Sequence, residues 1–372
     1  MKHASSPDGA RFAIDLAPVR AQPAGVGLYV ALLAEALVRV APDDIALIGV
    51  RPDAPALGEL PTGMSAIAAQ RSPFHAWMQL EADRAARSTG AALVHYTNAA
   101  APLISRLPYV LTVHDLSVVR MPGSHPRRRR LIVPLNLAAI ARARHLVVPS
   151  RWTARELRRI GVSGRRVTVI PHAPTLQPTG ADADAPARLG LGGGEYVLYV
   201  GTIEPRKNIE RLVAAFEVIA TERPNLRLVL VGGAGWLHEG IEKRIESSPF
   251  RSRIVRPGYL AGSEVAGLIA GCACFAYVSV YEGFGMPVLD AMAFGAPVVA
   301  SRTTSIPEAA GGAAVLVDPR DPADIARGLV EAMTRRDELR GKGLARASSR
   351  TWDDVAAEHL AVYRHAADQH DE

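Results

Sequence analysis

Short apolar runs alternate along the chain with longer stretches in which apolar residues recur every three or four positions. The first pattern is typical of buried strands and the second of amphipathic helices. In the first half, we expect strands at 11–17, 45–50, 92–97, 109–116, 145–150 and 166–171, with helices at 26–40, 77–87 and 152–161. Short connections between such elements predict an α/β fold with a parallel sheet covered by helices on both faces.

A stretch rich in proline and glycine, residues 171–194, interrupts this alternation. Such composition is typical of a linker. The alternation then restarts, and its clearest period lies in 208–223, where Ile209, Leu212 and Phe216 fall on one helical face. The pattern predicts a first domain at 1–172, a linker at 173–194, a second domain at 195–350 and a terminal helix at 351–372.

The segment YEGFGMPVLDAMAFGAPVVAS, 281–301, combines two acids with turn and helix signals. Gly283 and Gly285 permit a tight turn, Pro287 suits a helix start, and Gly295 suits its end. A helix over 287–294 would expose its N-terminus at a loop, where free N–H groups attract anions. The alternative is a capped connector that carries two surface acids. Downstream, Ser305 and Glu308 have the spacing of a capping box.

The segment YVGTIEPRKN, 199–208, leaves a strand and enters the periodic helix. Arg206 and Lys207 therefore lie at the carboxyl end of a strand and beside a helix N-terminus. A planar guanidinium and a compact ammonium in that position suit a diphosphate. The alternative is a basic turn with surface salt bridges, but the second predicted anion site at 287–294 favours the diphosphate.

Together these two motifs resemble the nucleotide-sugar domain of family-4 retaining glycosyltransferases, and their form is similar to that of bacterial mannosyltransferases. The resemblance extends over nearly the whole chain, through the GVG loop at Gly25–Gly27, TVHDL at 112–116, VVPSRWTARELRR at 147–159 and VIPH at 169–172. It implies the GT-B fold, in which two Rossmann-like doubly wound domains face each other across a cleft and the terminal helix crosses back to the first domain.

The resemblance also implies roles for individual residues of the second domain. Arg206 and Lys207 would hold the donor's diphosphate, and Glu282 would lie near the hydroxyls of the transferred sugar. Backbone N–H groups of Phe284, Gly285 and Met286 would meet sugar or phosphate. Asp290 stands where the family usually has glutamate and would contact the ribose, directly or through water, since aspartate is one methylene shorter.

In the first domain, His114 follows a predicted strand and resembles the family's active-site histidine. It would contact the donor sugar or stabilise positive charge at the anomeric carbon. Gly25 and Gly27 would let backbone approach the donor and the acceptor. The alternatives are a core histidine bonded to backbone and an ordinary strand-to-helix turn. His95, Asn98, Ser150 and His172 also follow predicted strand ends, and no role is predicted for them.

Composition restricts the class of protein. With 372 residues, 48% apolar and 22% charged, the chain is typical of a globular protein of two domains. No apolar segment suits a signal peptide or a membrane span. Cys272 and Cys274 fit one buried strand and supply neither a disulfide framework nor a metal site. We therefore expect a cytoplasmic protein.

Charge is distributed unevenly. Residues 1–170 hold 22 Lys and Arg against 11 Asp and Glu, and RRRR stands at 127–130. This basic stretch predicts contact with an anionic membrane surface on the inner face or with an acidic substrate; solvated helix faces are the alternative. Nucleic acid is not expected as a partner, because aromatic residues are rare in the basic stretch.

No cofactor or metal is expected. Asp182 and Asp184 spell D-x-D but lie in the predicted linker without a preceding strand. Cationic side chains and a helix N-terminus can stabilise a leaving diphosphate without a metal ion.

The resemblance to bacterial mannosyltransferases implies retaining transfer of mannose from GDP-mannose to a hydroxyl of a glycan or lipid-linked acceptor in surface polysaccharide assembly. Three alternatives remain: a UDP-sugar donor, a nicotinamide-dependent oxidoreductase, and a nucleotide-sugar-binding protein without activity. For the oxidoreductase, the nearest fingerprint is GGAGWLH at 232–238, where His238 occupies the place of the third glycine.

Overall fold

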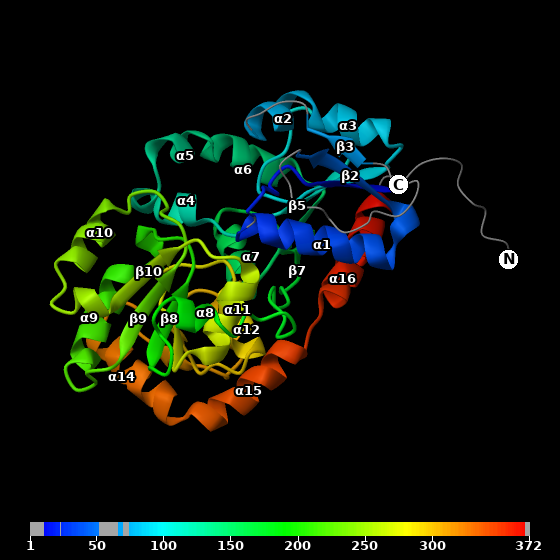
Figure 1. Cartoon of the computed structure of the whole chain (residues 1–372). Helices are drawn as coiled ribbons and strands as arrows, with labels where there is room; N and C mark the ends of the chain where they lie inside the picture. The colour runs from blue at the N-terminus through cyan, green and yellow to red at the C-terminus, as the bar shows by residue number, and fades with distance from the viewer. Residues whose placement is uncertain (1–10, 23, 52–65, 70–73, 369–372) are drawn as a thin grey trace. The chain divides into compact units, whose positions relative to one another are not determined.

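The computed structural model describes residues 11–22, 24–51, 66–69 and 74–368, which form two compact units (Figure 1). Unit 1 contains the described residues up to Leu116, then Leu131–His172 and the chain from Arg350 onward. Unit 2 contains Ser117–Arg130 and Ala173–Ser349. Each unit has its own parallel sheet with helices, so the predicted α/β class is confirmed.

Unit 1 is built on a seven-stranded parallel sheet with the order β3-β2-β1-β4-β5-β6-β7. Its strands are β1 Phe12–Asp15, β2 Ile45–Val50, β3 Ala66–Ala68, β4 Leu93–Tyr96, β5 Tyr109–Thr112, β6 His145–Val148 and β7 Val167–Val169. All but β3 were predicted. The helices are α1 Val26–Val40, α2 Phe74–Leu80, α3 Ala82–Ser88, α6 Val133–Arg142, α7 Arg151–Arg159 and α16 Trp352–Asp368, with short 3₁₀ turns at Pro42–Asp44 and Gly164–Arg166.

The terminal helix α16 belongs to unit 1, where it packs against α1 (Figure 1). It begins at a capping pair: Thr351 N donates to Asp354 over 2.8 Å, and Asp354 N donates to Thr351 Oγ1 over 3.2 Å. The predicted return of this helix to the first domain is confirmed.

A chain of buried hydrogen bonds joins α16 to the sheet. His359 Nδ1 lies 2.7 Å from the Val355 carbonyl and so carries the proton, which leaves Nε2 to accept from the Tyr29 hydroxyl at 3.0 Å. Tyr29 bonds to Thr112 at 3.2 Å, and His95 links Thr112 at 2.7 Å to Tyr363 at 2.6 Å. Burial lowers the pKa of His359 to about 4, so the His359 ring in this series of hydrogen bonds is uncharged at neutral pH.

Unit 2 is built on a six-stranded parallel sheet with the order β10-β9-β8-β11-β12-β13. Its strands are β8 Tyr196–Val200, β9 Arg227–Val231, β10 Ile254–Gly258, β11 Cys274–Tyr277, β12 Val298–Ser301 and β13 Val315–Val317. The strand order reverses between β8 and β11. Loops that follow two such strands open a crevice at the carboxyl edge of the sheet, the usual place for a ligand in this architecture.

The helices of unit 2 surround a continuous apolar core formed by these strands. They are α4 Ser117–Arg120, α8 Ala185–Arg188, α9 Ile209–Ala220, α10 Glu239–Glu246, α11 Gly262–Gly271, α12 Met286–Ala293, α13 Ile306–Ala310, α14 Pro322–Thr334 and α15 Arg336–Ser348, with 3₁₀ turns at Pro122–Ser124, Pro205–Lys207 and Arg251–Arg253. Helix α5, Arg127–Leu131, ends at the boundary between the units. Cys272 and Cys274 are buried free thiols.

The observed units differ from the predicted boundaries in two places. Residues 173–194, predicted as a linker, pack as part of unit 2 because Ala185 and Leu191 are buried in its core. Residues 117–130, predicted within the first domain, also pack in unit 2, where Trp236 Nε1 donates to the Ser124 carbonyl over 2.6 Å. Composition cannot reveal such packing, because it depends on contacts between distant residues.

Candidate active site

The loop between β8 and α9 presents the predicted cations. After β8 the chain forms a 3₁₀ turn over Pro205–Lys207, and Asn208 then adopts the left-handed conformation with φ 63°. This uncommon conformation is held by the Asn208 side chain, whose Nδ2 donates to the carbonyls of Val278 and Pro319 over 2.9 and 2.6 Å. The asparagine therefore fixes where Arg206 and Lys207 point.

The loop between β11 and α12 presents Glu282 and the N-terminus of a helix. Gly285 has φ 111°, and a methyl group in its place would lie 2.6 Å from Ile306 Cδ1. Only glycine fits here, as the sequence predicted for a tight turn. Helix α12 starts at Met286, one residue before the predicted start at Pro287. Pro287 has no N–H and Val288 N donates to the Gly285 carbonyl over 3.0 Å, so the partial positive charge of this helix end and the N–H groups of the residues that lead into it are what suit an anion.

The two loops meet at the reversal point of the sheet, and their charged side chains are bonded to one another. Arg206 donates to Glu282 Oε2 over 2.7 Å and to the Tyr281 carbonyl over 2.9 Å. Lys207 Nζ donates to Glu282 Oε1 over 2.7 Å. The structure thus brings Glu282 together with Lys207 and Arg206, which lie 75 and 76 positions before it in the sequence.

Two further residues complete this cluster and were missed by the sequence analysis. Glu204 Oε1 accepts from Arg206 over 2.8 Å. The Tyr277 hydroxyl accepts from Lys207 over 2.9 Å and donates to Glu282 over 3.1 Å. In the sequence, only their positions point to this site. Glu204 lies between a predicted strand and the cations, and Tyr277 lies at the end of β11. We refer to Glu204, Arg206, Lys207, Tyr277 and Glu282 as the charge cluster.

Burial and charge act in opposite directions on the acids of the cluster. Burial alone would raise the pKa of Glu282, but the positive charges of Arg206 and Lys207 outweigh it and lower this pKa to about 2. The carboxylate is therefore ionised throughout the neutral range. For Lys207, burial lowers the pKa and Glu282 opposes that shift.

Ser305 and Thr304 support the loop that carries Glu282. The predicted capping box at Ser305 and Glu308 is wrong, because Ser305 has helical backbone angles and its side chain caps nothing. Its hydroxyl donates instead to the carbonyls of Glu282 and Phe284 over 2.9 and 3.1 Å. Thr304, in a left-handed conformation with φ 58°, accepts from Glu282 N over 3.2 Å.

Asp290 is buried on α12 and bonded within unit 2. Its carboxylate accepts from Thr175 N at 2.5 Å, from the Thr175 hydroxyl at 2.8 Å and from Leu176 N at 3.1 Å. Burial raises its pKa to about 6 despite these bonds. The ribose contact stays a prediction, and a ribose hydroxyl would have to share this carboxylate with Thr175.

His114 lies two residues beyond β5 in unit 1, at the carboxyl edge of that sheet. Its Nε2 lies 2.9 Å from the Thr97 carbonyl and must therefore carry the proton, so Nδ1 is left as an acceptor. Burial lowers its pKa, which favours the neutral ring. The Tyr29 ring packs edge-on against it at 4.8 Å and fixes its orientation.

The glycines of the GVG loop also lie in unit 1. Gly25 has φ 52° and immediately precedes α1, and Gly27 is buried in the first turn of that helix. The left-handed conformation explains Gly25 as a turn residue, while contact with a ligand stays a prediction for both glycines. Ser150, which also follows a strand, caps α7 by accepting from Thr153 N over 3.1 Å.

The D-x-D sequence has a structural explanation. Asp182 forms an ion pair of 2.5 Å with Arg188 and also accepts from Asp184 N over 3.1 Å. Among the residues that the structure describes, no group of three His, Cys, Asp or Glu side chains could hold a metal ion.

The glycines of the segment 232–238 are likewise explained by packing. A methyl group on Gly232 would lie 2.1 Å from the Gly201 carbonyl oxygen, and one on Gly235 would lie 2.7 Å from Thr202 Cγ2. These glycines allow the loop after β9 to pack against the loop after β8. The segment therefore gives no support to a dinucleotide fingerprint.

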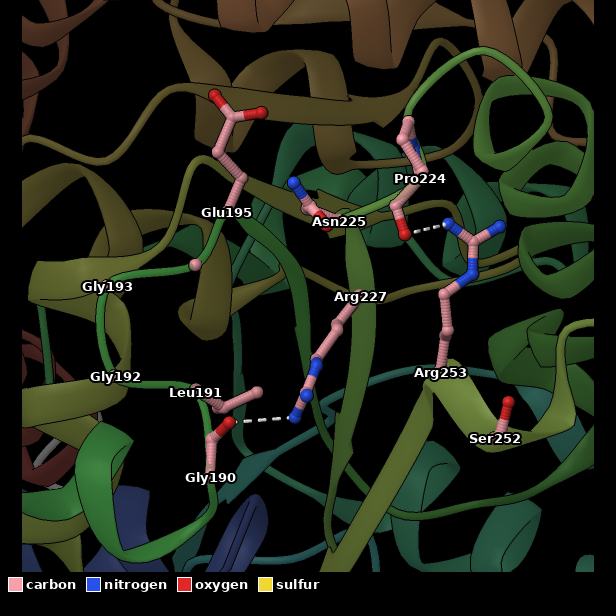
Figure 2. Close-up of a pocket in the computed structure, with 11 residues that line it drawn as sticks. Gly190, Leu191, Gly192, Gly193, Glu195, Pro224, Asn225, Arg227, Ser252 and Arg253 are labelled. Atoms are coloured by element: carbon pink, nitrogen blue, oxygen red, sulfur yellow. Dashed lines mark hydrogen bonds between the residues drawn. The ribbon is translucent and has the colours of Figure 1, made fainter.

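Figure 2 shows a pocket in unit 2 whose lining includes no residue of the charge cluster. Glu195 precedes β8, Arg227 begins β9 and Arg253 precedes β10, so the pocket is at the amino edge of the parallel sheet. Arg227 donates to the Gly190 carbonyl over 2.7 Å and Arg253 to the Pro224 carbonyl over 2.8 Å (Figure 2). These arginines stabilise loop ends, and the ligand edge of the sheet is the opposite one.

Comparison with protein families covers both units. The family model described as Glycosyltransferase Family 4 matches residues 23–174, and the model described as Glycosyl transferases group 1 matches residues 183–344.

Curated relatives agree with these matches. O-antigen chain mannosyltransferase B of Escherichia coli is 30% identical over 275 residues, which cover 68% of this chain and 70% of that protein. The serotype-specific mannosyltransferase WbdA of Escherichia coli is 33% identical over 175 residues, but these cover only 21% of that protein and 45% of this chain. D-inositol 3-phosphate glycosyltransferase of Segniliparus rotundus is 30% identical over 70% of this chain and 61% of that protein.

Solved structures share the whole fold at low sequence identity. Sucrose-phosphate synthase from Thermosynechococcus elongatus has a TM-score of 0.75 and 23% identity, covering 96% of this chain and 98% of that one. Anabaena HepE in complex with UDP-glucose has a TM-score of 0.72 and 19% identity, covering 95% and 99%.

The fold is therefore that of the two-domain GT-B enzymes. With both family models matched and a relative 30% identical over 70% of its length, the chain belongs to the family-4 glycosyltransferases of group 1.

Proposed function

We propose that this glycosyltransferase moves mannose from GDP-mannose to an acceptor hydroxyl with retention of anomeric configuration and without a metal ion. The observation that carries the proposal is the charge cluster, in which Arg206 and Lys207 lie at the reversal point of the unit 2 sheet. The mannosyltransferases among the relatives, at 30 and 33% identity, support the choice of donor sugar.

In the proposed reaction, the bond between the anomeric carbon and the diphosphate oxygen breaks as the acceptor oxygen bonds to that carbon from the same face. The acceptor proton passes to the leaving diphosphate oxygen. Lys207 and Arg206 stabilise the negative charge of the departing diphosphate, and the backbone N–H groups of Phe284, Gly285 and Met286, which lead into α12, are proposed as further donors. Glu282, ionised at neutral pH, accepts hydrogen bonds from the transferred sugar and orients it. Contact of His114 with the transferred sugar is part of this proposal.

The donor is tested by thermal unfolding with GDP, UDP, ADP and their sugars, in buffer that contains EDTA. A ligand at a hundredfold excess over its Kd stabilises the folded state by about 2.7 kcal/mol, so the true donor should raise the Tm clearly. We expect the largest rise with GDP-mannose. A larger rise with UDP-glucose, the ligand in the HepE complex, would mean that the donor is a UDP-sugar and not GDP-mannose. No rise with any nucleotide would contradict the proposed function.

We further propose that the acceptor is a glycan or a lipid-linked sugar in surface polysaccharide assembly, met at the inner face of a membrane. No described helix is long and apolar enough to cross a bilayer. Helix α5 supports this proposal: Arg127, Arg128 and Arg130 are exposed, and Leu131 at its end is 78% exposed. Arg129 is exposed as well, and its guanidinium lies 4.2 Å over the Trp236 ring.

Membrane contact is tested by co-sedimentation with vesicles of anionic or neutral lipid. We expect binding to anionic vesicles at low salt, weakened at high salt, and reduced in the variant Arg127→Glu/Arg128→Glu. The matched control is Arg251→Glu, a charge reversal at an exposed arginine of unit 2 that lies outside the basic stretch. Equal sedimentation with anionic and neutral vesicles would contradict the proposal.

A further inference from the structure

Glu204 is the ionisable acid of the charge cluster to which the proposed reaction gives no role. It is only 1% exposed, and its Oε1 accepts from Arg206 over 2.8 Å. The neighbouring loop covers it closely, since a methyl group on Gly235 would lie 3.2 Å from Glu204 Cβ. A carboxylate placed so deeply beside a cation needed for ligand binding calls for an explanation, because an exposed or neutral residue would avoid the cost of burying a charge.

The ionised charge cluster has no net charge. Glu204 and Glu282 contribute two negative charges, and Arg206 and Lys207 contribute two positive charges. The diphosphate of a nucleotide sugar brings two further negative charges into this buried region. Adding these two negative charges to a neutral, poorly solvated cluster is unfavourable unless a carboxylate of the cluster becomes neutral.

The two carboxylates are not equally able to accept a proton. Glu282 accepts from both Arg206 and Lys207 at 2.7 Å and from Tyr277 at 3.1 Å. In the described part of the chain, Glu204 has one ion pair, with Arg206. Glu204 is therefore the acid whose charge is more easily lost when a diphosphate competes for Arg206.

The groups nearest to Glu204 include a tyrosine and a histidine, and the variant Glu204→Gln below separates proton uptake by Glu204 from uptake by that histidine. Tyr199 of β8, whose hydroxyl donates to the Thr202 carbonyl over 3.1 Å, is neutral at working pH because burial raises its pKa well above 10. The loop 232–238 places Gly235 against Glu204, and His238 in that loop bonds to the Gly235 carbonyl at 2.8 Å. Arg206, Lys207 and Glu282 are the charged neighbours already described.

We propose that Glu204 takes up a proton from solvent when a nucleoside diphosphate sugar binds and returns it when the diphosphate product leaves. This inference rests on the proposed function, because it requires the diphosphate to bind at Arg206 and Lys207. It has a measurable consequence: donor affinity falls as pH rises, since the proton becomes harder to obtain.

The direction of the pKa of free Glu204 agrees with this role. Burial raises this pKa, and the opposing effect of Arg206 and Lys207 does not cancel the shift. The negative charge of a diphosphate would raise it further. For a group that binds a proton together with the ligand, Kd increases with pH by at most about tenfold per pH unit.

The test is titration calorimetry with GDP-mannose at one pH in buffers of different ionisation enthalpy, which yields the number of protons taken up. A nucleotide sugar is preferred to GDP because GDP has a terminal phosphate that itself titrates near neutrality. We expect net proton uptake by the wild type and a Kd that rises severalfold from pH 6.5 to pH 8. If the thermal panel selects another nucleotide sugar, that compound is the probe.

The decisive variant is Glu204→Gln, which keeps an oxygen for Arg206 but has no charge to neutralise. We expect tighter binding than the wild type at pH 8, no proton uptake, and a Kd that changes less than twofold over the same range. Glu222→Gln, at an exposed glutamate just after α9, is the matched control and should behave as the wild type.

The outcomes separate this inference from the proposed function. Binding without proton uptake in the wild type, or unchanged uptake in Glu204→Gln, overturns the inference and leaves the proposed function standing. Failure of every nucleotide sugar to bind overturns both.

Discussion

Replacing Lys207 by methionine is expected to lower kcat/KM by about two to three orders of magnitude, the usual effect of removing one donor that stabilises developing charge. Lys207 is 8% exposed, and its Nζ is fixed by Glu282 and the Tyr277 hydroxyl at 2.7 and 2.9 Å. An ammonium held in this way is already oriented when charge develops on the leaving diphosphate. Methionine keeps the apolar stem of the side chain and removes only its charge and donors. Arg206→Ala should have a similar effect.

The measurement is steady-state sugar transfer, with thermal unfolding of each variant to establish that it is folded. Lys342→Met is the matched control, because Lys342 also pairs with a glutamate at 2.7 Å but is 53% exposed on α15. It should keep normal turnover. If folded Lys207→Met and Arg206→Ala both turned over at nearly the normal rate, the diphosphate would not bind at these residues.

Glu282→Gln is expected to lower kcat by about two orders of magnitude or more while leaving nucleoside diphosphate binding intact or tighter. The carboxylate orients the transferred sugar in the proposed reaction, so its charge matters in the transition state. GDP without a sugar does not need that contact, and removal of one negative charge gives the cluster a net charge of +1, which favours an anion. The split between kcat and GDP affinity distinguishes a role at the sugar from a general loss of structure.

Acid stability provides an independent readout of Glu282→Gln. Because the pKa of Glu282 in the folded protein is about 2, below its ordinary value of 4.5, the ionised group stabilises the fold above about pH 4.5. This contribution is lost as pH falls towards 2, and the variant should lack it.

The control for the kinetic measurement of Glu282→Gln is Glu222→Gln. A variant with normal kcat would mean that Glu282 does not contact the transferred sugar.

Much of the fold could be predicted from the chain because its signals are local. Six of the seven strands of unit 1 stand out as apolar runs with turn residues at their ends. Strand β3, with its exposed Ala66 and Ala68, carries no such signal. The helix α9 repeats its apolar residues on one face, and Thr351 with Asp354 marks the start of α16.

The candidate site could be predicted only where residues near in sequence share a loop. Arg206 and Lys207 are adjacent, and Glu282 precedes Gly285 and α12 within five residues. Ser305 shows the limit of this reasoning. The sequence assigned it to a helix cap, whereas it bonds to the carbonyls of Glu282 and Phe284, more than twenty positions away. The spacing of neighbouring residues does not indicate a hydrogen bond to carbonyls that are so distant in the sequence.

The sequence by itself determined the parallel α/β fold, the two halves and the positions of the cations and of Glu282, because propensity, periodicity and turn chemistry act between neighbours. Only the tertiary structure decided that Glu204 and Tyr277 join those residues, that Asp290 bonds to Thr175, and that residues 117–130 pack in unit 2. Those facts depend on strand order, which brings distant loops together at one edge of a sheet, and on burial, which then makes each charge require a partner.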